Sequence, residues 1–173
     1  RMHVLPAILS FLERHPQLEP VITFSDRFVE PVEEGIDLLV RSGGSGIWPG
    51  AVDHRKLGIQ RLILCAAPHY LSKYGMPQSE QALSQHRCVL YCRNDGNLSP
   101  LRLAGQRHAQ KHQHSVLALG DTEGMVMAAL AGHGIVQLPT WLVAKHLEQK
   151  TLVQVLPELS ISGMPISLAW LKS

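Results

Sequence analysis

The most constraining stretch of the sequence is an apolar run that lies between a glycine and a loop rich in serine and glycine. Four of the five residues in 36–40 are apolar, a pattern typical of a strand that helices cover on both faces of its sheet. Gly35, directly before the run, has the position of a glycine that ends a preceding helix. The stretch therefore predicts a buried strand of an α/β protein.

The loop that follows this strand, Arg41 to Gly46, is the first candidate for a binding site. In open α/β sheets, ligands sit beyond the carboxyl ends of the strands, and glycines let a ligand approach the backbone closely. We therefore predict that Ser42 and Gly43 bind a small effector. The alternative is an ordinary turn at the end of a strand.

Length and composition narrow the class of protein. A chain of 173 residues can bury a core and fits one domain or two small lobes. With 45% hydrophobic and 17% charged residues it has the composition of a soluble globular protein, and no apolar run approaches the roughly 20 residues of a membrane span. The opening residues lead straight into an amphipathic helix, so we expect no secretory signal.

Charge and cysteine usage indicate the compartment and exclude one class of partner. The net charge of +2 comes from Lys and Arg residues scattered along the chain. The sequence therefore predicts no clustered basic surface for binding DNA. Cys65, Cys88 and Cys92 form an odd set without paired CxxC motifs. This favours reduced thiols in a cytoplasmic protein over a disulfide framework.

Hydrophobic periodicity predicts alternating strands and helices, and hence an α/β architecture with a substantially parallel sheet. Pro31 fits its predicted helix only if that helix is short or begins late, because an interior proline costs about 3 kcal/mol. Hairpin strands and loops are expected over 93–114. The predicted helices are 3–15, 25–34, 68–74, 79–83, 121–133 and 141–149, and the predicted strands are 21–24, 36–40, 57–67, 88–91, 115–119, 135–138, 152–156 and 166–170.

A combination of short motifs, in order along nearly the whole chain, carries a resemblance to a known family. The motifs are Leu5-Pro6, Phe11-Leu12, His15-Pro16, Ser25-Asp26-Arg27, Glu34-Gly35-Ile36-Asp37, Arg41-Ser42-Gly43, Arg55-Lys56-Leu57-Gly58, Leu64-Cys65-Ala66-Ala67-Pro68, Tyr70-Leu71, Ala129, Ala131-Gly132-His133-Gly134-Ile135, Leu138-Pro139 and Trp141-Leu142-Val143. Together they resemble the effector-binding domain of LysR-type transcriptional regulators.

That resemblance implies a fold like the type 2 periplasmic binding proteins. Two Rossmann-like α/β lobes would be joined by two crossing strands, with a ligand cleft between the lobes. One lobe would contain residues 1–64 plus 164–173 and the other residues 65–163, with the crossings near 62–67 and 162–166. The family's first strand, its last helix and its upstream helix-turn-helix have no counterpart in this sequence.

Further effector-binding residues are expected along the implied cleft. Ser25 and Asp26 follow a predicted strand, although helix capping alone would explain them. The family pattern places Ala67 and Pro68 along the cleft, where the alternative is hinge geometry set by proline. Residues Asp121 and Thr122 begin a helix whose N-terminus would favour an anionic ligand, but the Asp121 carboxylate would oppose one.

The remaining motifs argue against a metal, a cofactor or catalysis. His108, His112 and His114 have a spacing that could bind a metal, but no Cys or carboxylate completes the set of ligands. Cys88 and Cys92 are best explained as packing residues. The glycines of 43–46 lack the GxGxxG spacing and a following helix, so we predict no dinucleotide. GxSxG, HExxH and P-loop motifs are also absent from the sequence, so we predict no enzyme.

The favoured hypothesis is a bacterial sensor domain that binds a small metabolite and controls DNA binding by the helix-turn-helix domain missing here. The resemblance implies a homodimer or a higher homo-oligomer, and no membrane partner. Candidate dimer residues are Val4, Ile8, Phe11, Leu12, Met125 and Ala129, although these could equally face the core of their own chain. The alternatives are an exported solute-binding protein of the same fold and a small α/β enzyme.

Overall fold

The computed structural model describes residues 4–25, 27, 29–43, 47–93, 95–105 and 114–172. Among the predicted residues, Asp26, His108 and His112 lie outside the described residues, as does 44–46 of the loop after the central strand.

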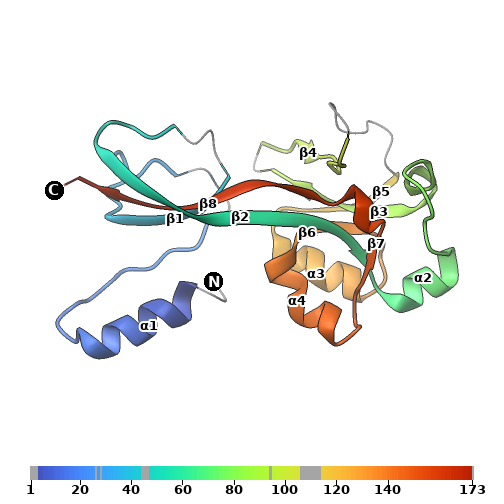
Figure 1. Cartoon of the computed structure of the whole chain (residues 1–173), viewed down its shortest axis with the longest axis horizontal. Coiled ribbons are helices and arrows are strands. Elements are labelled where there is room, and N and C mark those ends of the chain that lie inside the picture. The colour runs from blue at the N-terminus through green and yellow to red at the C-terminus, as the bar shows by residue number, and fades with distance from the viewer. Residues whose placement is uncertain are drawn as a thin grey trace.

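Two long antiparallel strands organise the molecule. Residues 52–62 of one strand pair with residues 161–171 of the other, and the two run side by side between the two halves of Figure 1. They belong to a five-stranded sheet of order β1-β8-β2-β6, in which β7 also pairs with β2. The strands of this sheet are β1 (Leu38–Ser42), β2 (Val52–Ala66), β6 (Val136–Pro139), β7 (Val153–Val155) and β8 (Ile161–Leu171).

The right-hand half of Figure 1 holds a second sheet and most of the helices. The second sheet has the order β4-β3-β5, and its β3 and β5 are parallel. Its strands are β3 (Arg87–Cys92), β4 (Leu98–Ser99) and β5 (His114–Leu119), and the helical segments are α2 (Pro68–Tyr74), the 3-10 helix η1 (Gln81–Gln85), α3 (Thr122–Leu130), α4 (Thr140–Glu148) and the 3-10 helix η2 (Pro157–Leu159).

The core of the chain lies almost entirely in this half, in two clusters that share the strand β2. Ile63 and Cys65 belong to one cluster, with α3, β6 and α4 around them. Leu64 and Ala66 belong to the other, together with Tyr70 of α2. Because successive side chains of a strand point to opposite faces, one fully buried segment of β2 serves both clusters.

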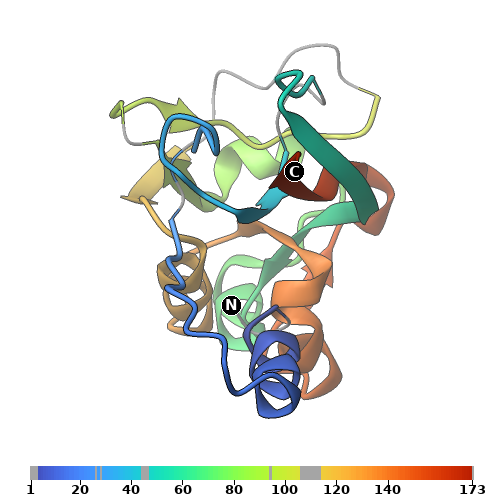
Figure 2. The same ribbon diagram turned by 90° about the vertical axis from the view of Figure 1, so that its left-hand side faces the viewer.

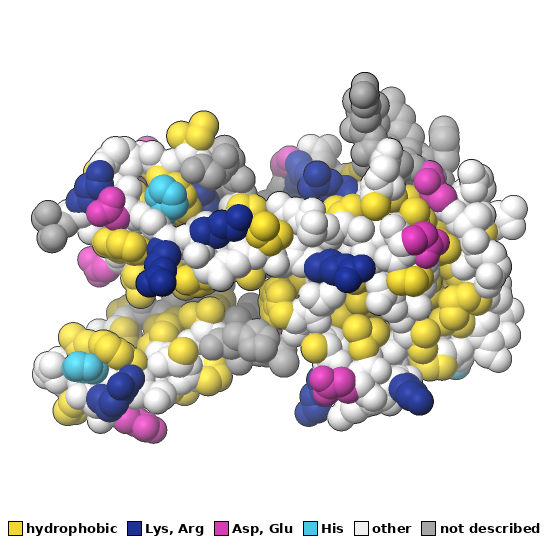
Figure 3. Space-filling model, viewed as in Figure 1, with side chains coloured by type: hydrophobic (Ala, Val, Ile, Leu, Met, Phe, Trp, Pro, Cys, Tyr) yellow, Lys and Arg dark blue, Asp and Glu magenta, His cyan; other side chains and the backbone are white. Residues whose placement is uncertain are grey.

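The left-hand half has no comparable core among the described residues. Helix α1 (Val4–Arg14) has no buried residue. Both ribbon views place it below the strands and apart from them (Figures 1 and 2). The space-filling view shows an open gap between α1 and the strand layer, with hydrophobic side chains beside it (Figure 3). The apolar faces of helix and sheet therefore do not pack against each other.

This arrangement contradicts the prediction that the central strand is buried on both faces. The strand begins at Leu38 instead of residue 36, and none of its five residues is buried. The side chain of Leu38 is 56% exposed. Among the described residues, β8 is the only strand that pairs with β1. The apolar run predicted the strand correctly, but not its burial, because burial depends on what the rest of the chain packs against it.

The strand predicted at 21–24 and the helix predicted at 25–34 are not formed by the described residues. Val21 is 94% exposed, and its segment has no strand partner to satisfy its backbone groups. Only a turn over 31–35 is present. It ends at Gly35, which has φ +63°, and the Ile36 N–H donates to the Pro31 carbonyl at 2.9 Å. Pro31 thus begins the turn, where its missing N–H costs nothing.

The prediction of a substantially parallel sheet is wrong for the larger sheet. All of its pairings, β1 with β8 and β2 with β6, β7 and β8, are antiparallel. The parallel arrangement required the missing strand at 21–24 and its crossover helix. Among the described residues, the parallel pairings are the β3–β5 ladder of the second sheet and an isolated bridge between Cys88 and Ile135.

The other predicted elements form close to their predicted bounds, and local signals explain their ends. Asp121 caps α3, accepting from the Gly124 N–H at 2.6 Å. Gly75, with φ +84°, follows α2 and donates its N–H to Leu71. The strand predicted from Leu57 begins earlier, at Val52, and the helix predicted at 79–83 is η1. Both are boundary differences in correctly predicted elements.

Candidate functional site

The end of β1 packs against the middle of β8, beside the crossing of the two long strands. Ser42 lies opposite Ile166, and the Gly43 N–H donates to the Pro165 carbonyl at 2.8 Å. Gly43 has φ +83°, and a Cβ on it would lie 3.3 Å from the sulfur of Met164. A glycine is needed here, because the backbone conformation is left-handed and the neighbouring side chain is close. The exposed Ser42 hydroxyl is available to a ligand at this point.

A cationic and aromatic cluster lies next to that end of β1. The Arg41 guanidinium stacks over the Trp48 ring at 4.1 Å, and the Trp48 ring stacks on His54 of β2 at 5.6 Å. Partial burial lowers the pKa of Arg41, and the negative charge of Glu30 opposes that shift. Trp48 contacts residues of β1 and β2, the strands on either side of β8. These contacts hold Trp48 against the sheet.

Sequence reasoning missed two residues beside the crossing. Gln60 of β2 is only 5% exposed, and its Oε1 accepts from the Trp141 Nε1–H at 3.1 Å. Trp141 belongs to the first turn of α4. Gln60 stands beside Arg61 just before the apolar part of β2, which is a weak sequence signal for such a pair. The sequence placed Trp141 at the start of a predicted helix without indicating a partner.

Ala67 and Pro68 lie where β2 passes into α2. Ala67 is the N-cap residue of α2 and is almost wholly buried, while Pro68 occupies the first helical position and is exposed. The Ala67 carbonyl accepts from the Leu71 N–H at 3.2 Å. Pro68 thus sets the geometry at the start of α2, and the binding role of Ala67 and Pro68 stays a prediction.

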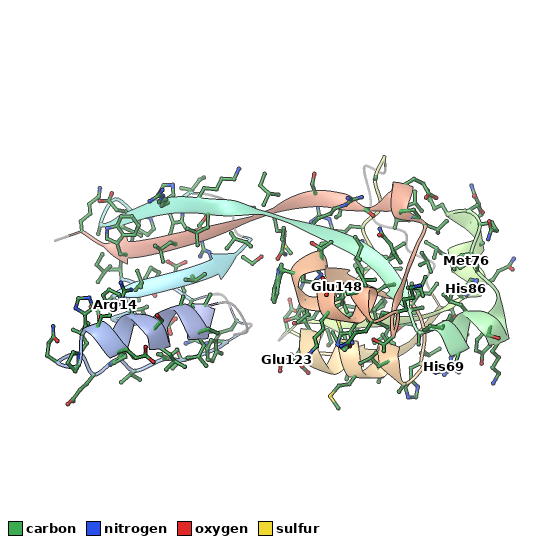
Figure 4. All side chains as sticks on the ribbon, turned by 60° about the horizontal axis from the view of Figure 1, so that its bottom comes forward. Arg14, His69, Met76, His86, Glu123 and Glu148 are labelled. Atoms are coloured by element: carbon green, nitrogen blue, oxygen red, sulfur yellow. The ribbon has the colours of Figure 1, made fainter. Side chains whose placement is uncertain are left out.

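Asp121 and Thr122 begin α3, which lies in the other half from Ser42 (Figure 1). No hydrogen bond among the described residues joins either of them to Ser42 or Gly43. In Figure 4, Glu123 lies at the end of α3 nearer to α1. Together with the exposed Asp121 it makes this helix N-terminus acidic. Arg41, with the Glu30 charge acting on it, thus lies in one half, and the carboxylates of Asp121 and Glu123 lie in the other.

Ser25 takes part in a local turn. Its hydroxyl accepts from the Arg27 N–H at 3.1 Å, and Arg27 forms a two-pronged ion pair with Glu34. The hydrogen bonds from Arg27 lower the pKa of the Glu34 carboxyl. The Ser25 hydroxyl thus caps a local turn instead of the predicted helix, and its role in effector binding stays a prediction. Nothing in the described residues places Ser25 beside Ser42.

Two of the six residues predicted at a dimer interface lie in the core of their own chain. Met125 and Ala129 of α3 are buried in the first core cluster, against residues of β2 and β6. This is the alternative that the sequence left open. The other four, Val4, Ile8, Phe11 and Leu12, are half-buried or exposed on α1.

Two thiols and a histidine among the described residues, all of them reactive side chains, are buried in the packing of the chain. Burial raises the pKa of the Cys65 thiol to about 12 and that of Cys88 to about 11. His86 Nδ1 and the Tyr70 hydroxyl share a hydrogen bond of 3.1 Å. Burial lowers the pKa of His86. Figure 4 places His86 and His69 at the end of the molecule away from α1. The described residues contain no cluster of three or more His, Cys, Asp or Glu that could hold a metal ion.

Within the described part of the chain, no helix is both long and apolar enough to span a membrane.

Comparison with protein families gives one match over the whole chain. The family model described as the LysR substrate binding domain matches residues 1–173. Among curated proteins, the transcriptional activator TtdR of Escherichia coli K12 is 35% identical over 94% of this chain and 52% of its own length. The regulator DmlR of the same strain is 34% identical over 91% of this chain and 51% of its own length. The chain thus spans about half the length of these relatives.

Comparison of folds gives the same result. The regulatory domain of CrgA, a LysR-type transcriptional regulator from Neisseria meningitidis, superposes with a TM-score of 0.82 at 25% identity. The match covers 99% of this chain and 83% of that domain. The regulatory domain of AphB from Vibrio vulnificus, at 18% identity and a TM-score of 0.75, shares the fold. The fold is therefore that of LysR regulatory domains, which is like that of type 2 periplasmic binding proteins.

Proposed function

This chain belongs to the family of LysR substrate-binding domains, and from that membership we propose that it is the effector-sensing part of a transcriptional regulator. The observation that carries the proposal is the match of the family model to residues 1–173. The relatives and the superposed structures named above are regulators, which favours this function over a solute-binding protein or an enzyme.

We place the effector between the two halves, at the end of β1. Ser42 is exposed there, and Arg41 supplies a positive charge close by. The family pattern suggests how the chain divides into lobes. Residues 1–64 with 164–173 would form one lobe and residues 65–163 the other, joined through β2 and β8.

The proposed mechanism is a shift between two arrangements of the lobes. A small metabolite that binds one arrangement more tightly raises its population, and only this difference in affinity can do so. The shift would reposition helix-turn-helix domains outside this chain, because the relatives named as transcriptional regulators are about twice as long. Such a protein works in the cytoplasm, which agrees with the three unpaired cysteines.

The placement of the effector predicts a specific loss in the variant Ser42→Trp. A metabolite bound at 100 times its Kd stabilises the folded protein by about 2.7 kcal/mol and raises Tm accordingly. Because an indole at the end of β1 would fill the proposed site, we expect the variant to lose most of this shift. The measurement is a thermal-shift screen of small metabolites on the wild type, repeated with each active compound on the variant.

Ser72→Trp is the matched control, since Ser72 is an exposed serine of α2 at the far end of the molecule. It should keep the wild-type shift with every active compound. Retention of the full shift by Ser42→Trp would show that the effector binds elsewhere.

We further propose that α1 contributes to a homodimer, because its apolar residues have no core to join in this structure. Ile8 is half-buried on the apolar side of α1, whereas Ser10 is exposed. Replacing Ile8 by Glu would place a carboxylate in the interface and should raise the dimer Kd at least about tenfold, equivalent to about 1.4 kcal/mol. Sedimentation over a range of concentrations measures this Kd.

Ser10→Glu is the control on the opposite side of the helix and should dimerise like the wild type. Circular dichroism establishes that both variants are folded. A folded Ile8→Glu protein with unchanged Kd would exclude this face of α1 from the interface.

A further inference from the structure

The ladder between β2 and β8 has two irregularities, one at Leu57 and one at Gly163 near the middle of the molecule. Gln60 pairs with Met164 and Arg61 pairs with Ser162, so Gly163 has no partner on β2. An extra residue of this kind is a β-bulge, which bends the strand that carries it. Residues 52–60 of β2 lie on one side of this bend. The segment that pairs with β6 and β7 lies on the other.

The bond between Gln60 and Trp141 crosses this bend. The antiparallel ladder between β2 and β6 ends at the pair Leu62 and Pro139. If the same register is continued by two residues on each segment, Gln60 lies opposite Trp141. The backbone of Trp141 cannot continue the ladder, because α4 begins at Thr140. The hydrogen bond from Trp141 Nε1 to Gln60 Oε1, at 3.1 Å, takes the place of the next ladder bond.

The same residue is linked to the end of β1. Gln60 lies opposite Met164 in the β2–β8 ladder, and the Met164 sulfur lies close to Gly43. A short row of contacts thus runs from Gly43 through Met164 and Gln60 to Trp141. It joins the strand end proposed to bind the effector to the first turn of α4 in the other half.

We propose that Gln60 is a positioning residue whose bond to Trp141 sets the angle between the two halves of the molecule. The bulge at Gly163 lets the long strands bend, and the bond limits how far they do so. Gln60 is largely buried, so the loss of its amide acceptor removes a direct bond between β2 and α4 that water cannot readily replace. The consequence for effector sensing rests on the function proposed above, but the effect on the angle does not.

The test measures the distance between the halves without any effector. Spin labels at Lys56→Cys in β2 and Lys145→Cys in α4 lie on opposite sides of the bulge, and both positions are exposed. The background is Cys92→Ser, because Cys65 and Cys88 are fully buried. Labelled protein is diluted with unlabelled protein, so that only distances within one chain contribute to the signal in double electron–electron resonance.

We expect Gln60→Met, which keeps the length of the side chain but removes its acceptor, to shift or broaden the distance distribution. Trp141→Phe, which removes the donor, should produce the same change, and the double variant should add nothing to it. If one variant fails to fold, the other still provides the test.

Gln137→Met is the matched control. Gln137 of β6 also makes side-chain hydrogen bonds, to the backbone of Arg102 at 3.0 and 2.6 Å, but both residues lie in the same half. This variant should lose stability while keeping the wild-type distance. A wild-type distribution in both Gln60→Met and Trp141→Phe would overturn the proposal, as would an equal shift in Gln137→Met. The effector screen with Ser42→Trp is independent of these outcomes.

Discussion

Replacing Leu64 by alanine is expected to lower the free energy of unfolding by about 2–5 kcal/mol. Leu64 is fully buried in β2, with β6 on one side and β7 on the other. Its side chain belongs to the second core cluster, together with Tyr70 and Ile135. Truncation removes buried apolar surface and leaves a cavity that a close-packed core cannot fully close. Urea unfolding followed by circular dichroism measures the change.

The same substitution at Leu57 provides the control on the same strand. Leu57 is 55% exposed and is the unpaired residue at the irregularity between Lys56 and Gly58. Its replacement by alanine should change the free energy of unfolding by about 0.5 kcal/mol or less. Equal losses at the two positions would contradict the conclusion that the core is confined to the half that holds α2, α3 and α4.

The second large effect is expected at Gly134, between α3 and β6. Gly134 has φ +154°, and a Cβ on it would lie 2.4 Å from the Arg87 carbonyl oxygen. That oxygen accepts from the Ile135 N–H at 2.9 Å, and the Ile135 carbonyl accepts from Val89 at 3.0 Å. Alanine would strain the backbone by about 1–3 kcal/mol and weaken two hydrogen bonds worth about 1 kcal/mol each. We therefore expect a loss of about 2–5 kcal/mol in the free energy of unfolding.

Gly58→Ala should have the opposite sign. Gly58 lies in β2, and a Cβ there would meet no atom within 4 Å. Alanine loses less backbone entropy on folding than glycine, so the variant should be more stable by about 0.5–1 kcal/mol. Denaturant unfolding of both glycine variants checks the pair. A Gly134→Ala protein as stable as the wild type would mean that β3 and β6 are not held together at this point.

Most of the candidate site depends on contacts that no local pattern encodes. The run 36–40 correctly indicated a strand, and the structure places Ser42 and Gly43 against β8. It could not indicate that Met164 lies beside Gly43, because the pairing of β1 with β8 joins residues more than 120 positions apart. The bond between Gln60 and Trp141, 81 positions apart, was missed for the same reason. The roles of Ser42, Asp121 and the other predicted effector-binding residues stay predictions.

The sequence by itself determined the elements whose signals are local. The Asp121 cap of α3, the apolar stripe of α3 and Gly75 after α2 act within a few residues, so they placed these elements within a few positions. Only the tertiary structure decided which faces are buried, as Leu38 and Leu64 illustrate, and that the large sheet is antiparallel. The physical reason is that burial and strand pairing are properties of two segments at once. An apolar run indicates that a strand will be covered by another segment, but it does not indicate which segment that will be.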